Sequence, residues 1–191
     1  MRIDERVVGW HVPLSHATQT LRSAHADLQA LGLKQSDIPF LVQLVENPKY
    51  DFPGIDLFPG ATDLLAHDRI HILLGRGLLA KDEAFVIGFT MGSTDRIGAT
   101  EERLYAFFAK YLYPRAYRFN DEDVRVFRDA VRLGFVSDCV PLDRADFEPL
   151  LDLPLSEARA RLGIEDDLLR AYYAIEKRRY RHSVESQRLL A

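Results

Sequence analysis

Cysteine is nearly missing from this chain, because Cys139 is the single cysteine among its 191 residues. One cysteine cannot form a disulfide within the chain, and it cannot supply the thiolates of a cysteine-rich zinc site. A reducing compartment therefore fits, and we expect a cytoplasmic protein. We expect Cys139 itself to be a buried small side chain.

Long hydrophobic runs are missing as well. No stretch of 18 or more consecutive apolar residues occurs, so the sequence predicts no membrane-spanning segment. The first ten residues, MRIDERVVGW, contain Asp4 and Glu5 and have no apolar core. We therefore expect them to be neither a secretory signal nor a transit peptide.

Neither sign of charge is in large excess. The chain has 25 Lys and Arg against 29 Asp and Glu, which gives a formal net charge of −4. Nucleic-acid binding normally needs a clear basic excess, so we expect no nucleic-acid partner. The hydrophobic fraction of 47% is ordinary for a globular protein, and this length suits one domain.

Helical patterns dominate what is present. Leu21, Ala24, Leu28 and Leu31 recur at helical spacing in residues 17–31. Start and stop residues predict further helices from near Pro39, from 62 to 75–77, from 81 through FVIGFTMG, from 100 to 114, from 120 to 134, from 156 to 163, and from 165 into a Lys/Arg-rich end. Residues 47–61 indicate a structured loop, and RIHILL, AFVIGF and GFVSDCV are strand candidates.

These patterns predict an all-α fold, with a single multi-helix domain over residues 1–191. Within it we expect residues 1–35 and 140–191 to be peripheral extensions of the part that carries the metal motif, residues 67–83. The chain contains no repeat and no low-complexity segment.

The segment HDRIHILLGRGLLAKDE, residues 67–83, carries the chemistry. On a helix His67 and His71 lie about 40° apart, and Asp68 lies about 100° from His67, so the three side chains share one sector. A continuous helix would carry Glu83 about 18 Å beyond His71. A reversal of the chain at the glycines, residues 75 and 77, would instead let Glu83 face back.

Two neutral imidazoles and two carboxylates balance the charge of a divalent cation, which makes their burial tolerable. We therefore predict a metal site formed by His67, Asp68, His71 and Glu83. The imidazoles favour zinc as the cofactor, and iron, manganese and magnesium stay open. The sequence assigns no catalytic residue.

The spacing H-D-x-x-H-(x)11-E resembles the signature of the ubiquinone (coenzyme Q) biosynthesis protein 4 family, a small helical family with a zinc motif of this form. His67, Asp68, His71 and Glu83 match it position by position. The resemblance covers 17 residues strictly, and residues 36–118 by helix pattern.

The resemblance implies a metal-dependent lyase or oxidoreductase in quinone biosynthesis, or a protein that organises other enzymes of the pathway. It implies a prenylated lipid or quinone precursor as partner, with ring decarboxylation and hydroxylation as the chemistry. Peripheral contact with the inner membrane face and an apolar cavity between the helices holding FVIGFTMG and YAFFAKYLY would follow. A homodimer stays open.

Three other interpretations compete. One is a non-catalytic lipid-binding or scaffold protein whose metal is structural. Another is an HD-type metal-dependent phosphohydrolase, in which His25 and Asp129 would join the doublet His67-Asp68. The third is a dinucleotide fingerprint, G-x-G-x-x-A at residues 75–80, which needs a strand before it. The terminal run EKRRYRH is typical of a solvated helix end, with contact to anionic lipid as the alternative.

Overall fold

The computed structural model of the chain describes residues 8–32, 64–94, 106, 110 and 118–190. Its helices in these ranges are α2 (Leu21–Gln29), α4 (Leu64–Leu74), α5 (Ala80–Gly92), α7 (Asp121–Val136), α8 (Leu155–Leu162), α9 (Asp166–Arg179) and α10 (Val184–Arg188), with short 3-10 helices at Leu142–Arg144 and Glu148–Leu150. No strand occurs in the described ranges, so the predicted all-α class is confirmed. The helix predicted near Pro39 and the loop 47–61 lie outside them, as does the helix predicted from 100 to 114 apart from residues 106 and 110.

The three strand candidates are wrong. RIHILL lies in α4, AFVIGF lies in α5, and residues 134–136 of GFVSDCV form the last turn of α7. The physical reason is clearest for α5, in which residues 81–92 are all buried. A helix surrounded by protein has no polar face, so its apolar run cannot be told from a buried strand by periodicity.

Three glycines bring α5 and α7 into close contact. A Cβ atom on Gly88 or Gly92 of α5 would collide with the backbone carbonyl of Phe127 or Val131 of α7, and one on Gly134 would collide with the carbonyl of Phe89. Gly134 was predicted to close its helix, but α7 continues to Val136. Gly134 therefore allows α5 to lie close to α7, and it does not end α7.

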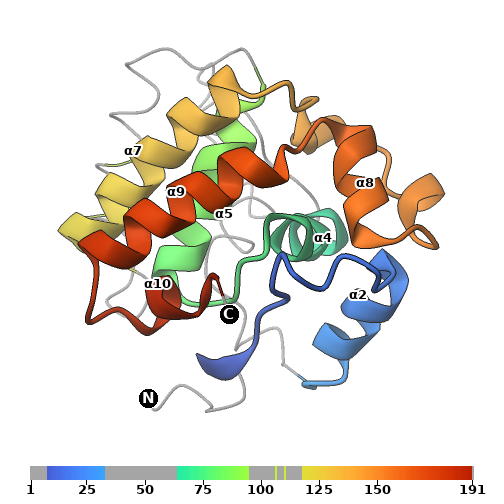
Figure 1. Cartoon of the computed structure of the whole chain (residues 1–191), viewed down its shortest axis with the longest axis horizontal. Helices are drawn as coiled ribbons and strands as arrows, with labels where there is room; N and C mark the ends of the chain where they lie inside the picture. Colours follow the sequence, from blue (N-terminus) through green and yellow to red (C-terminus); the bar gives the residue numbers. More distant parts are fainter. Residues whose placement is uncertain (1–7, 33–63, 95–105, 107–109, 111–117, 191) are drawn as a thin grey trace, which may run out of the picture.

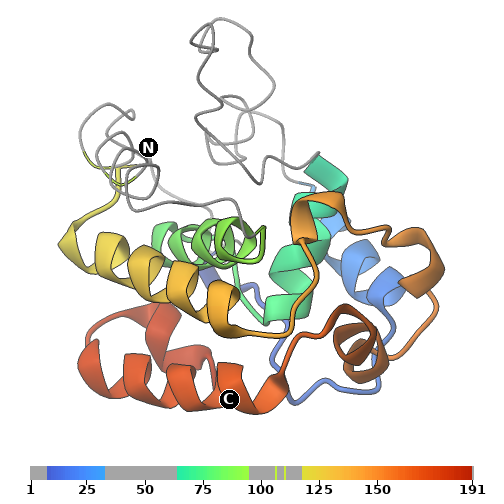
Figure 2. The same ribbon diagram turned by 90° about the horizontal axis from the view of Figure 1, so that it is seen from above.

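The helices form two groups around one core. In Figures 1 and 2, α5, α7 and α9 lie together, and α2, α4 and α8 lie at the other end of the molecule. Phe85 of α5 joins the helices of the first group, since its ring packs on Tyr172 and Tyr173 of α9. The hydrophobic core also includes buried residues from both ends of the chain, among them Val12, Leu14, Leu155, Leu162 and Leu189. Residues 8–32 and 140–190 thus contribute to the same core as the motif helices.

A tight turn connects α4 to α5. Gly75 has a φ of +68°, a left-handed conformation that glycine adopts without strain. The chain then enters α5 at Ala80, where the Asp82 carboxylate accepts a hydrogen bond from the Leu79 backbone N–H at 3.2 Å. Glu83 consequently lies in the first turn of α5. None of the helices in the described ranges is long and apolar enough to cross a membrane.

Candidate metal centre

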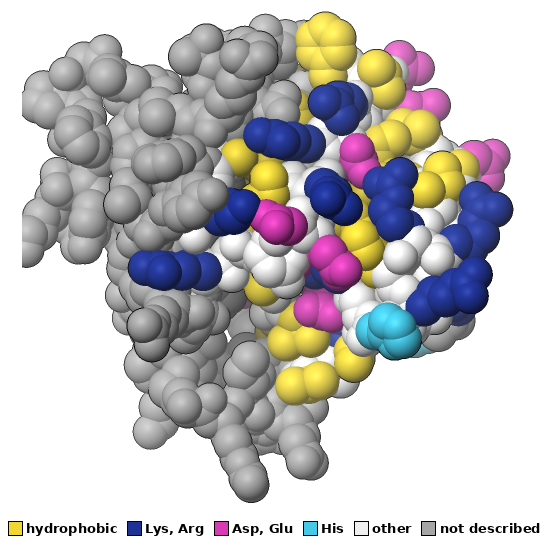
Figure 3. Space-filling view, turned by 90° about the vertical axis from the view of Figure 1, so that its left-hand side faces the viewer, with side chains coloured by type: hydrophobic (Ala, Val, Ile, Leu, Met, Phe, Trp, Pro, Cys, Tyr) yellow, Lys and Arg dark blue, Asp and Glu magenta, His cyan; other side chains and the backbone are white. Residues whose placement is uncertain are grey.

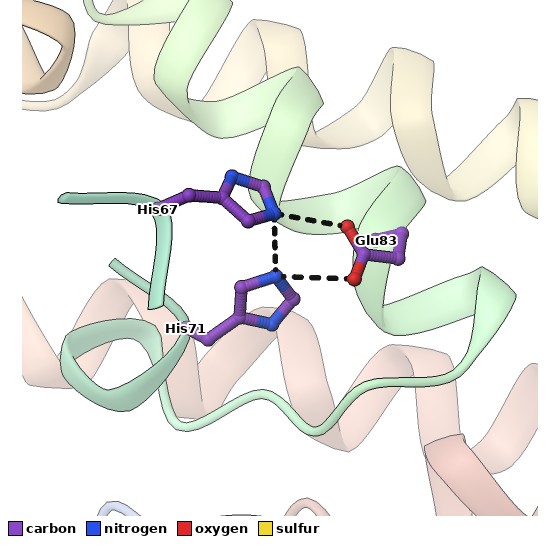
Figure 4. A group of neighbouring side chains, drawn as sticks. All are labelled: His67, His71 and Glu83. Atoms are coloured by element: carbon purple, nitrogen blue, oxygen red, sulfur yellow. Dashed lines mark hydrogen bonds and ion pairs between the residues drawn. The ribbon is translucent and has the colours of Figure 1, made fainter. Parts of the chain in front are cut away.

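His67, His71 and Glu83 converge from two helices (Figure 4). The two histidines lie one turn apart on α4, and Glu83 faces them from α5. His67 Nε2 lies 3.0 Å from His71 Nε2 and 3.1 Å from Glu83 Oε2, and His71 Nε2 lies 3.4 Å from Glu83 Oε1. The reversal expected at Gly75 is therefore present, and it brings Glu83 back to both imidazoles.

The second ring nitrogen of His71 is occupied by the backbone. His71 Nδ1 donates a hydrogen bond to the carbonyl oxygen of Gly77 at 2.6 Å, since that oxygen can only accept. In a neutral imidazole this places the lone pair on Nε2, which faces His67 and Glu83. Histidine ligands of metals are commonly held in this way by a backbone carbonyl or carboxylate.

Burial and charge make the cluster favour a positive charge. His71 is fully buried, and burial alone would lower its pKa, but the carboxylates of Glu83, Asp68 and Asp82 together outweigh that effect and raise the pKa of His71. Burial would likewise raise the pKa of Glu83, yet His71 and His67 hold that pKa well below its usual range. The carboxylate therefore stays ionised beside two imidazoles, which is the state in which it could bind a cation.

The donor set fits a divalent metal ion. Ligand atoms placed about 2.0–2.1 Å from a tetrahedral zinc ion are about 3.3 Å apart. The three distances within the cluster, 3.0, 3.1 and 3.4 Å, are close to that spacing. Two nitrogen ligands and one oxygen ligand leave a coordination position for water or substrate, as in catalytic zinc sites. These three residues could hold a metal ion.

Asp68, the fourth predicted ligand, lies beside the cluster and outside the group of converging ligand atoms. Its Oδ2 atom is 3.7 Å from Nε2 of His25 on α2. Burial raises the pKa of Asp68, and the nearby histidines His71, His67 and His25 oppose this only in part. The sequence predicted that Asp68 converges with the other three residues, and the structure places it beside them and next to His25.

Of the two residues that the phosphohydrolase interpretation adds, His25 does lie beside Asp68, with 3.7 Å between Nε2 and Oδ2. Asp129, which the phosphohydrolase interpretation needs, contacts Arg179 at 3.1 Å and Tyr172 at 3.5 Å. The segment before the dinucleotide fingerprint is α4, so no strand precedes Gly75. The fingerprint therefore lacks the structural context on which its phosphate binding depends.

Sequence reasoning missed a buried ion pair behind the loop between α4 and α5, residues 75–79. Arg76, between the two loop glycines, donates two hydrogen bonds to Glu176 of α9, at 3.0 and 2.6 Å, and both side chains are fully buried. Glu176 opens the run EKRRYRH, which was predicted to be a solvated helix end. The charged residues that follow fit that prediction, since Arg178, Arg179, Arg181 and His182 are exposed. The sequence feature that could have indicated the Arg76–Glu176 pair is the position of Arg76, a charged residue directly after an apolar helix.

A separate hollow of about 290 Å³ lies near the start of α7 and the end of α9. Its lining includes Lys81, Asp123, Arg179, Tyr180 and Glu185. This end of the molecule faces the viewer in Figure 3, where Lys and Arg side chains alternate with Asp and Glu. The hollow contains none of the predicted site residues and carries charges of both signs.

No protein-family model, curated protein or solved structure matches this chain. The likeness of residues 67–83 to the ubiquinone biosynthesis family therefore stays a prediction from the motif.

Proposed function

We propose that this chain is a metalloprotein in which His67, His71 and Glu83 hold one divalent cation. The observation that carries the proposal is the convergence of three ligand atoms of the motif from two helices, all within 4.8 Å of one another. Asp68 is the proposed fourth ligand, because it follows His67 on the same helix and lies next to the cluster, and water or substrate would then take a fifth coordination position. Zinc is the proposed ion, on the basis of the two imidazoles.

We further propose a role in quinone biosynthesis, with a polyprenylated aromatic precursor as the substrate. This part depends on the motif resemblance. A divalent ion bound here would polarise a ring carboxylate or activate water. His71 and Glu83 are deeply buried, whereas the side chains of His67 and Asp68 are 11% and 23% exposed, so substrate would approach from their side.

The prenyl tail would supply most of the affinity, because each buried methylene contributes about 0.8 kcal/mol. The predicted cavity beside the metal needs the helix over residues 105–113, most of which lies outside the described residues. Phe85 and Phe89 of the neighbouring helix belong to the hydrophobic core. Peripheral contact with a membrane surface would deliver such a lipid, and remains part of the proposal.

A second candidate is a non-catalytic lipid-binding or scaffold protein whose metal is structural. The full burial of His71 between α4 and α5 favours this candidate, because structural sites join elements of the core. The two candidates differ in what removal of the metal does to the fold.

The test is elemental analysis of protein purified without chelator, for the wild type, His71→Ala and the exposed control His182→Ala. We expect one equivalent of metal in the wild type and in the control, and a loss of most of it in His71→Ala. A wild type that carries no metal and takes none up would overturn the proposal.

Thermal melting and complementation of a quinone-deficient strain then separate the two candidates. A His71→Ala variant that keeps the wild-type melting point but fails to complement indicates a functional metal. A variant that unfolds indicates a structural one.

A further inference from the structure

His25 lies on α2, outside the metal motif, and its imidazole meets the motif at Asp68. Its side chain is 10% exposed, and Nε2 is buried without a hydrogen-bond partner. Oδ2 of Asp68 lies 3.7 Å from this nitrogen. A buried polar atom without a partner is costly, so its position beside a carboxylate needs an explanation.

The carboxylate of Asp68 lies where it could contact both His25 and a metal ion. It follows His67 directly and interacts electrostatically with His71, His67, His25 and Glu83. One side of its carboxylate therefore faces α2, and the metal cluster lies close by. Carboxylate ligands are themselves held by hydrogen bonds from a second residue, which fixes the oxygen that binds the metal.

We propose that His25 is a positioning residue for the metal centre, which holds one oxygen of Asp68 while the other oxygen binds the cation. This inference rests on the proposed function. A hydrogen bond of ordinary length needs Nε2 and Oδ2 to approach by about 0.8 Å, which a small side-chain rotation provides. The metal centre then involves three helices, α2, α4 and α5.

Other contacts hold α2 in place without His25. Leu21 and Ala24 pack into the hydrophobic core. The backbone N–H groups of Leu21 and Arg22 donate to the carbonyl oxygens of Leu153 and Leu151, at 3.3 and 2.8 Å. Removal of the His25 imidazole should therefore leave the position of α2 unchanged and weaken metal binding.

The test is titration of the metal-free protein with cobalt(II), whose visible spectrum reports the number and geometry of its ligands. The variants are His25→Ala, His25→Gln, which keeps an N–H donor, and the exposed control His16→Ala. We expect His25→Ala to weaken cobalt binding about 10- to 100-fold and to change the spectrum. His25→Gln should recover much of the affinity, and His16→Ala should match the wild type.

Asp68→Ala completes a double-mutant cycle. If His25 acts through Asp68, His25→Ala adds little to the loss caused by Asp68→Ala. Wild-type affinity and spectrum in His25→Ala would overturn the inference while leaving the metal site intact, as would a fully additive double variant. A wild type that binds no cobalt would instead overturn the proposed function on which the inference rests.

Discussion

Arg76 and Glu176 are 100 positions apart in the chain, and both side chains are fully buried where they pair. The guanidinium also stacks on Phe85 and Tyr173, with 3.8 and 4.4 Å from Cζ to the ring centroids. Ser186 donates a further hydrogen bond to Glu176, at 2.9 Å. At the scale of single residues, this network holds the loop between α4 and α5 against α9.

Replacement of Arg76 by methionine should therefore destabilise the protein strongly. The variant leaves the Glu176 carboxylate buried without its cation, which typically costs about 3–5 kcal/mol of unfolding free energy. Denaturant unfolding of the wild type and Arg76→Met measures this loss.

The matched control is Arg161→Met, which removes an exposed arginine paired with Glu157 at 2.8 Å. Exposed pairs of this kind contribute about 0–1 kcal/mol. If the two variants were equally stable, the buried pair would not have the role assigned to it. The double variant Arg76→Met with Glu176→Leu should regain part of the lost stability, because no charge is left unpaired.

At the scale of helices, the contact between α5 and α7 depends on the absence of a side chain. A methyl group at Gly92 would overlap the Val131 carbonyl oxygen of α7, which the backbone cannot easily move. We expect Gly92→Ala to lower the unfolding free energy by about 1–3 kcal/mol, as overpacked cores do. Thermal melting followed by circular dichroism measures the effect. Gly9→Ala is the control, because its added methyl group meets nothing within 4 Å. Equal melting temperatures for the two variants would contradict the close approach.

Helix ends were predicted well where local chemistry decides them. Asn120 caps α7, since its side chain accepts from the backbone N–H groups of Glu122 and Asp123, and Gly163 ends α8, both as the sequence indicates. Gly134 was misinterpreted, because its role depends on α5, which is distant in the sequence. Local caps can be recognised in a sequence, whereas a close approach of two helices cannot.

At the metal site too, local features could be predicted from the sequence, whereas contacts between distant helices could not. Helical period places His67 and His71 together, and the turn at Gly75 explains the return of Glu83. The contact of His25 with Asp68 joins residues 43 positions apart, and the sequence offered His25 only as a residue available to the phosphohydrolase interpretation, with no spacing rule to link the two positions. Pairs of this kind depend on how α2 packs against α4.

At the scale of the whole molecule, residues near the two ends of the described part of the chain meet behind the loop between α4 and α5. Arg188 of α10 donates to the backbone carbonyl of Val8 and to the buried carboxylate of Asp82, the residue before Glu83. A Cβ atom at Gly77, whose carbonyl holds His71, would collide with the Arg188 guanidinium and the Trp10 carbonyl. The C-terminal helix and the N-terminal segment therefore support the loop that positions two of the three converging residues.

The two helices of the metal centre differ in how they can move. Glu83 is carried by α5, which is buried from residue 81 to 92 and lies against the α7 backbone. The histidines are carried by α4, whose first turn includes Leu65 at 50% exposure. Local opening of α4 therefore needs less free energy than opening of α5, so a bound ion would leave through fluctuations of α4.

Amide hydrogen exchange should show faster exchange in α4 than in α5 without metal, and added zinc should slow exchange mainly in α4. Equal protection of both helices in the metal-free protein would contradict this difference.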